Sequence, residues 1–156
     1  MSKTPQTPDT PRSTFVYVTY IRTTQEKLWT ALTDAEFMKQ YWFGVSIQSD
    51  WKVGSPWKMA YPDGKLTDSG TVLEFDPPRR LVLKWRNEFR PELAAEGWSR
   101  CVYEVEPADN AMKLTITHSI EVAESKLINA VSGGWPRILC NLKSLLETGQ
   151  PLATTK

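Results

Sequence analysis

Apolar and polar residues alternate along several short stretches of the chain, a pattern typical of strands that bury one face of a sheet. Residues 112–118 show it most clearly, because Leu114, Ile116 and His118 fall on one face and lysine or threonine residues on the other. Turn sequences rich in Gly, Pro, Asp and Asn separate these stretches. The pattern predicts an antiparallel meander with strands at residues 14–22, 45–49, 56–61, 70–75, 81–85, 98–106 and 112–119.

Two short helices are predicted between the first two strands. Thr23 with Glu26, and Thr33 with Glu36, have the spacing of capping boxes, in which a hydroxyl and a carboxylate bind the free N–H groups of a first helical turn. We therefore expect helices at residues 24–32 and 34–40.

A longer helical pattern follows the last strand. Its apolar positions recur every three or four residues, at Leu127, Ile128, Val131, Trp135, Ile138, Leu139, Leu142, Leu145 and Leu146. Gly133 and Gly134 interrupt it, and a glycine inside a helix costs about 1 kcal/mol. Pro136 is tolerated in the first turn of a restarting helix. We therefore expect a kink or a break at the glycine pair.

Length and composition fit one α+β domain, since 156 residues can bury a core without disulfide or metal support. We expect the domain at residues 14–149, a disordered tail at 1–13 that is polar and proline-rich, and a second tail at 150–156. Cys101 and Cys140 are expected to be buried, reduced thiols, and no metal site is indicated because the chain has a single histidine.

The net charge of +1 gives no field that would attract nucleic acid or an anionic membrane. No signal peptide and no apolar run long enough to span a bilayer is present, so we expect a cytoplasmic protein without membrane insertion. Nothing in the sequence implies a cofactor. The sequence is compatible with a monomer or a homodimer.

Five sequence words resemble one protein family in order and spacing. They are LWTALTDAEFMKQYW (28–42), VGSPWKM (53–59), SGTVLEFDPPRRLVLKW (69–85), MKLTITH (112–118) and GWPRILCNLKSLLE (134–147). The chain is identified as similar to the family homologous to the C-terminal domain of the activator of Hsp90 ATPase, within the START-like superfamily. The resemblance implies a helix-grip fold, in which a curved antiparallel sheet of six to seven strands wraps around a long C-terminal helix.

The same resemblance implies a cavity between sheet and helix. Seven tryptophans are available to line it or to fill it as core, and both alternatives stay open. Our main hypothesis is binding of a small hydrophobic or aromatic ligand, without catalysis. The candidate lining consists of Trp42, Trp57, Met59, Leu83, Trp85, Tyr103, Ile116, His118, Trp135 and Leu139.

Two other hypotheses are kept. In the first, the pocket is a cyclase-type or hydrolase-type active site with His118 as base, against the alternative that His118 is hydrogen-bonded within the core. In the second, the domain is a chaperone-associated interaction module, although the separate N-terminal domain of the co-chaperone has no counterpart in the dozen polar residues here. Residues 87–97 are expected to form a long hairpin loop, with a ligand-gating lid as the alternative. Glu104 and Glu106 are expected to face solvent.

Overall fold

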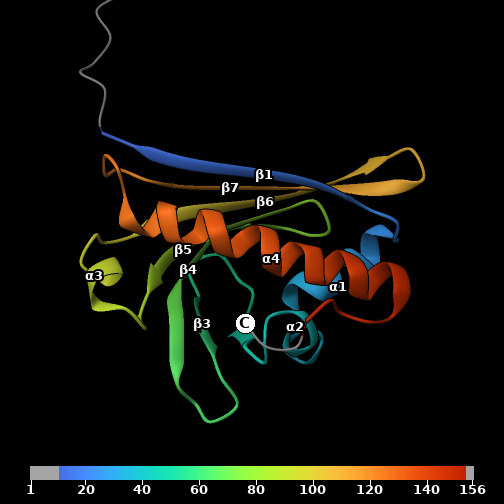
Figure 1. The fold of residues 1–156 in the computed structure, drawn as a ribbon, viewed down its shortest axis with the longest axis horizontal. Coiled ribbons are helices and arrows are strands. Elements are labelled where there is room, and N and C mark those ends of the chain that lie inside the picture. The colour runs from blue at the N-terminus through green and yellow to red at the C-terminus, as the bar shows by residue number, and fades with distance from the viewer. Residues whose placement is uncertain (1–10, 154–156) are drawn as a thin grey trace, which may run out of the picture.

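The computed structural model describes residues 11–153 and has the predicted helix-grip architecture (Figure 1). A first strand and two short helices are followed by six further strands and a long last helix. The elements are β1 (Ser13–Ile21), α1 (Gln25–Thr33), α2 (Ala35–Tyr41), β2 (Ser46–Ser49), β3 (Pro56–Ala60), β4 (Leu66–Asp76), β5 (Arg80–Asn87), α3 (Pro91–Ala94), β6 (Ser99–Ala108), β7 (Ala111–Ile120) and α4 (Lys126–Thr148).

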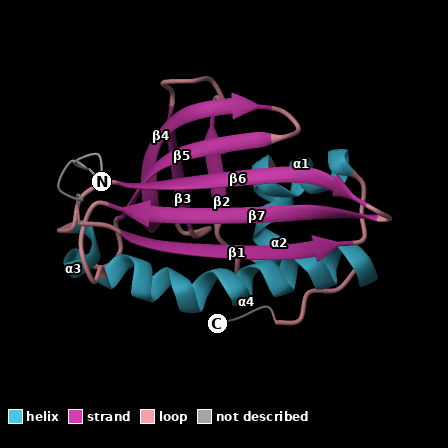
Figure 2. Cartoon of the chain, turned by 90° about the horizontal axis from the view of Figure 1, so that it is seen from above, coloured by secondary structure: helices cyan, strands magenta, loops and turns pink. Residues whose placement is uncertain are grey.

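The seven strands form one antiparallel sheet in the order β1-β7-β6-β5-β4-β3-β2. Strands β2 to β7 lie side by side in chain order, and β1 is added at the far edge, where it pairs with β7 from Ser13↔Ile120 to Ile21↔Met112. One face of this curved sheet packs against α4, which runs alongside β1 (Figure 2). The predicted alternation in β7 is confirmed, since Leu114, Ile116 and His118 are fully buried.

Helix α4 is continuous, so of the kink or break expected at Gly133 and Gly134 the break is wrong. The apolar side of α4 explains why the helix persists, because Trp135, Leu139 and Leu142 are at most 3% exposed against the sheet and the short helices. Burying a large apolar side chain contributes about 2 kcal/mol or more. Packing of several such residues therefore outweighs the cost of two glycines.

The first turns of α1 and α2 differ from the predicted capping boxes by one residue. Thr24, not Thr23, caps α1 and accepts a hydrogen bond from the Lys27 N–H (3.2 Å), while Asp34, not Thr33, caps α2 through the Phe37 N–H (2.9 Å). Asp34 ends one helix and caps the next, so the two helices follow each other without a linker.

Two further expectations need correction. Cys101 is buried as predicted, but Cys140 is exposed, because it falls on the side of α4 that faces away from the core. Strand β4 begins at Leu66, four residues before the predicted start. Most of the expected first tail, residues 1–10, and residues 154–156 lie outside the described residues, whereas Ser13 belongs to β1.

Candidate functional site

Three tryptophans from three elements meet between the sheet and α4. Trp42 follows α2, Trp85 lies in β5 and Trp135 lies in α4. The Trp42 and Trp135 ring centroids are 5.3 Å apart at 78°, and those of Trp85 and Trp135 are 5.9 Å apart at 64°. Trp42 and Trp85 are closer to parallel, at 23° and 6.5 Å. Indole rings in steeply crossed orientations therefore build the centre of this region.

His118 adjoins this cluster and is hydrogen-bonded through both ring nitrogens. The Trp135 Nε1–H donates to Nδ1 (3.1 Å), and Nε2 lies 2.8 Å from the Ser99 hydroxyl, which donates to the Trp85 carbonyl (3.1 Å). An indole N–H can only donate, so Nδ1 must accept and the ring proton must sit on Nε2. Each group in this chain therefore donates to the next one, from the Trp135 N–H through His118 and Ser99 to the Trp85 carbonyl in β5.

Burial lowers the pKa of His118 to about 3, so the ring is neutral at neutral pH. The chain's only histidine is therefore committed to protein contacts on both nitrogens. Burial also raises the pKa of Tyr103 well above its ordinary value. These groups hold the interior together, in agreement with the alternative in which His118 is a bonded core residue.

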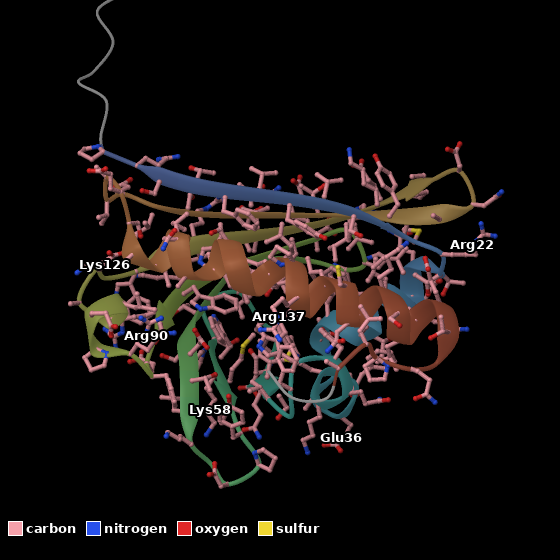
Figure 3. All side chains as sticks on the ribbon, viewed as in Figure 1. Arg22, Glu36, Lys58, Arg90, Lys126 and Arg137 are labelled. Carbon is pink, nitrogen blue, oxygen red and sulfur yellow. The ribbon has the colours of Figure 1, made fainter. Side chains whose placement is uncertain are left out.

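A pocket of about 280 Å³ lies beside the tryptophan cluster, at the end of the molecule where α3 approaches the start of α4. Its walls are mostly apolar and aromatic. The lining residues are Trp42, Tyr61, Thr67, Asp68, Trp85, Asn87, Phe89, Arg90, Leu93, Leu127, Ala130, Val131, Gly134, Trp135 and Ile138. Arg90 lies at this end together with Lys126, the first residue of α4 (Figure 3).

The segment between β5 and β6 forms one wall of this pocket. The hairpin loop expected at 87–97 contains the helical turn α3, and Leu93 within it is only 3% exposed. Glu96 joins this segment to α4, because its carboxylate accepts hydrogen bonds from the Ser125 hydroxyl, the Lys126 N–H (2.8 Å) and the Leu127 N–H (3.2 Å). One carboxylate thereby binds the free N–H groups at the start of α4.

Asp68 brings a carboxyl group to the pocket. In the β4–β5 register, Asp68 pairs with Asn87 and Gly70 with Trp85, and residues two apart share a face. Asp68 therefore faces inward with Gly70, and its Oδ2 accepts a hydrogen bond from the Trp85 Nε1–H (2.8 Å). Arg90, the other charged residue of the lining, pairs with Glu92 at 3.0 Å.

Of the ten residues predicted to line a cavity, Trp42, Trp85 and Trp135 line this pocket. The other seven belong to the buried core that packs beneath it: Trp57, Met59, Leu83, Tyr103, Ile116, His118 and Leu139. Trp57 shows how closely this part is packed, since its Nε1–H donates to the Lys84 carbonyl (2.9 Å) beside Gly70.

Glu104 and Glu106 lie on the outer face of β6, as expected. Glu104 forms a salt bridge with Arg80 (3.0 Å) and Glu106 lies 3.7 Å from Lys113. Within residues 11–153, no group of three or more His, Cys, Asp or Glu side chains could hold a metal ion. No helix in that range is long and apolar enough to cross a membrane.

The fold is similar to that of several solved structures. The Aha1 dimer from Colwellia psychrerythraea has a TM-score of 0.71 at 20% identity, over 88% of this chain and 98% of that one. PFC0360w, an HSP90 activator from Plasmodium falciparum, has a TM-score of 0.68 at 23% identity, over 85% and 95%. DynU16, from the dynemicin biosynthetic locus, has a TM-score of 0.73 at 20% identity, over 96% and 52%.

At these identities the structures show a shared fold and no shared activity. No curated protein sequence matches this chain. The sequence itself is more specific, because residues 22–147 match the family described as Activator of Hsp90 ATPase homolog 1-like protein. That match covers most of the chain and confirms the resemblance seen in its five sequence words, so the protein belongs to this family.

Proposed function

We propose that the protein binds a small, mainly apolar ligand in the pocket between α3, α4 and the β4–β5 hairpin, without transforming it. The observation that carries the proposal is the composition of the lining, in which aromatic and aliphatic walls surround a few polar groups at fixed positions. This is the usual composition of small-molecule sites. The volume of about 280 Å³ suits a compact molecule.

Gly134 supports the same proposal. It lies in the middle of α4, where glycine costs about 1 kcal/mol relative to alanine. A Cβ at this position would meet no atom within 4 Å, so packing does not require glycine there. Because Gly134 lines the pocket, the missing side chain leaves room for a ligand.

The enzymatic alternative has less support. Its proposed base, His118, makes two hydrogen bonds to protein groups and is not among the residues that line the pocket. A general base needs to reach the proton that it removes. Binding without turnover is the simpler use of this lining.

Tryptophan fluorescence tests the proposal, since three indoles line the pocket. The protein is titrated with fatty acids, flavonoids, aromatic polyketides and small aryl-alkyl compounds while emission and melting temperature are followed. A ligand at 100 times its dissociation constant adds about 2.7 kcal/mol of stability. If no compound changes either signal, and mass spectrometry of the purified protein finds no co-purifying molecule, the proposal fails.

A further inference from the structure

The polar lining of the pocket keeps hydrogen-bond donors in reserve, and Asn87 is the clearest case. Its Oδ1 accepts hydrogen bonds from the Phe89 N–H (2.9 Å) and the Arg90 N–H (2.7 Å). Because a backbone N–H can only donate, the orientation of the amide is fixed and both lone pairs of Oδ1 are used. The Asn87 Nδ2 makes no hydrogen bond to another described residue. Asn87 therefore offers the pocket N–H donors and no further acceptor.

Tyr61 adds a hydroxyl group from the turn between β3 and β4. It lines the same pocket, is half-buried, and its Oη forms no hydrogen bond within residues 11–153. The Thr67 hydroxyl, in contrast, already donates to the Met59 carbonyl (3.3 Å). Two side chains from separate segments thus keep hydrogen atoms available for a ligand.

The helical side of the pocket is apolar. Helices α3 and α4 contribute Leu93, Leu127, Ala130, Val131 and Ile138. The three tryptophans of the lining are at most 9% exposed, so they close the inner end of the pocket and hold no ligand group among themselves. Space for a ligand is therefore bounded by aliphatic side chains on the helices and by Tyr61 and Asn87 on the strands.

A negatively charged end group would find little support in this space. Among the described residues that line the pocket, Arg90 is the only cation, and it is exposed and donates to Glu92 through two hydrogen bonds of 3.0 and 3.3 Å. A carboxylate that leaves water needs a partner charge that is not already engaged. An uncharged acceptor needs only a donor, and Asn87 and Tyr61 supply donors.

Resting on the proposed function, we propose that the pocket selects uncharged ligands that carry a carbonyl group, as in a ketone, ester or lactone, on an apolar body. The carbonyl oxygen accepts a hydrogen bond from the Asn87 Nδ2–H, the Tyr61 hydroxyl is a second donor, and the apolar body packs against α3 and α4. A carbonyl oxygen has two lone pairs and no hydrogen, so it matches a lining whose unused groups can donate.

Three probes of nearly equal shape test this choice. Benzylacetone carries a ketone, its methylene analogue has a CH₂ group in place of the carbonyl oxygen, and hydrocinnamate has a carboxylate in place of the acetyl group. Calorimetric titration of the wild-type protein should show the tightest binding for benzylacetone. It should bind about fivefold more tightly than the methylene analogue, the gain expected from one neutral hydrogen bond.

Asn87→Asp tests the first donor. It keeps an oxygen for the Phe89 and Arg90 N–H groups and replaces the Nδ2 donors by an acceptor. It should bring the affinity for benzylacetone down to that for the methylene analogue. Asn110→Asp is the same change in the exposed turn between β6 and β7, outside the pocket lining, and should leave the ranking intact.

Tyr61→Phe tests the second donor, because it removes the hydroxyl and keeps the ring. The affinity for benzylacetone should fall about threefold. Tyr20→Phe is the matched control, since Tyr20 is exposed on the outer face of β1, and it should leave the affinity unchanged.

The outcomes separate the two proposals. If none of the three probes nor any compound of the wider panel binds, the proposed function fails. If the methylene analogue or hydrocinnamate binds as tightly as benzylacetone, or if neither Asn87→Asp nor Tyr61→Phe weakens benzylacetone, the pocket binds ligands but the carbonyl inference is overturned. Should Asn87→Asp fail to fold, the wild-type ranking and Tyr61→Phe still decide between these results.

Discussion

Two neighbouring regions between the sheet and α4 differ in how they are filled. Around His118 the space is packed, and each polar side chain of the network has a partner. Toward α3 the same layer opens into a pocket with Asp68 inside and Arg90 at its rim. Apolar periodicity alone does not distinguish these regions, because a residue that fills a core and one that lines a pocket both point inward.

The largest effect is expected in the packed region. His118→Ala removes the partner of the Trp135 N–H and of the Ser99 hydroxyl and leaves a cavity, so we expect a loss of about 3–5 kcal/mol in unfolding free energy. Urea denaturation measures it. Thr117→Ala, on the outer face of the same strand, should cost less than about 1 kcal/mol. A similar cost for both variants would contradict the role given to His118.

The same histidine predicts how stability depends on pH. The pKa of His118 is lowered by burial from 6.5 to about 3 in the folded protein. The unfolded chain therefore takes up the proton first, and stability is lost as the pH falls below the unfolded value. Between about pH 7.5 and about pH 5.5, the unfolding free energy should fall by about 1.4 kcal/mol.

Urea denaturation at several pH values measures this slope. Because the chain has one histidine, the slope should vanish in His118→Asn, which has no group that titrates in this range. A wild-type protein with no slope would show that His118 protonates as easily in the folded state as in the unfolded chain.

A smaller effect is expected where α3 joins α4. Burial raises the pKa of Glu96, but hydrogen bonds from Ser125, Lys126 and Leu127 outweigh it, and the net shift is downward. The carboxylate thus stabilises the folded protein above its unfolded pKa of about 4.3, and this contribution is lost as the pH falls through the lower, folded value. At neutral pH, Glu96→Gln should cost about 1 kcal/mol.

Glu92→Gln is the matched control, since Glu92 lies in the same segment and its ion pair with Arg90 is exposed. Its cost should be clearly smaller than that of Glu96→Gln, as exposed ion pairs contribute little. The difference between Glu96→Gln and the wild type should shrink below about pH 4. Equal costs for the two variants, or a difference that does not depend on pH, would contradict the capping role of Glu96.

The sequence predicted the fold well because strand and helix periodicities are long and consistent. It allowed a break in α4 at the glycine pair, which the helix does not have, because propensity was weighed without the packing of Trp135 and its neighbours. It placed the caps one residue early because Thr23 and Thr33 fit a capping pattern, while Thr24 and Asp34 offer equally good acceptors. Where two adjacent residues could each cap a helix, tertiary contacts decide which of them does.

Much of the pocket could not be predicted. Asp68 follows a turn and lies among polar residues of low strand propensity, so the start of β4 was missed and the inward direction of Asp68 with it. Phe89, Arg90 and Leu93 come from the segment between β5 and β6, for which a lid was only an alternative. Had the strand been predicted to begin at Leu66 instead of residue 70, the alternation would have placed Asp68 on the inner face of the sheet with Gly70.

The most direct test of the pocket compares two substitutions at adjacent positions of α4. Gly134→Leu and Gly133→Leu both replace a helical glycine where a Cβ would meet no atom, and only Gly134 lines the pocket. Calorimetric titration with a compound of the panel that binds the wild-type protein should show affinity weakened at least about tenfold in Gly134→Leu and unchanged in Gly133→Leu. Equal binding by both variants would place the ligand elsewhere and contradict the account.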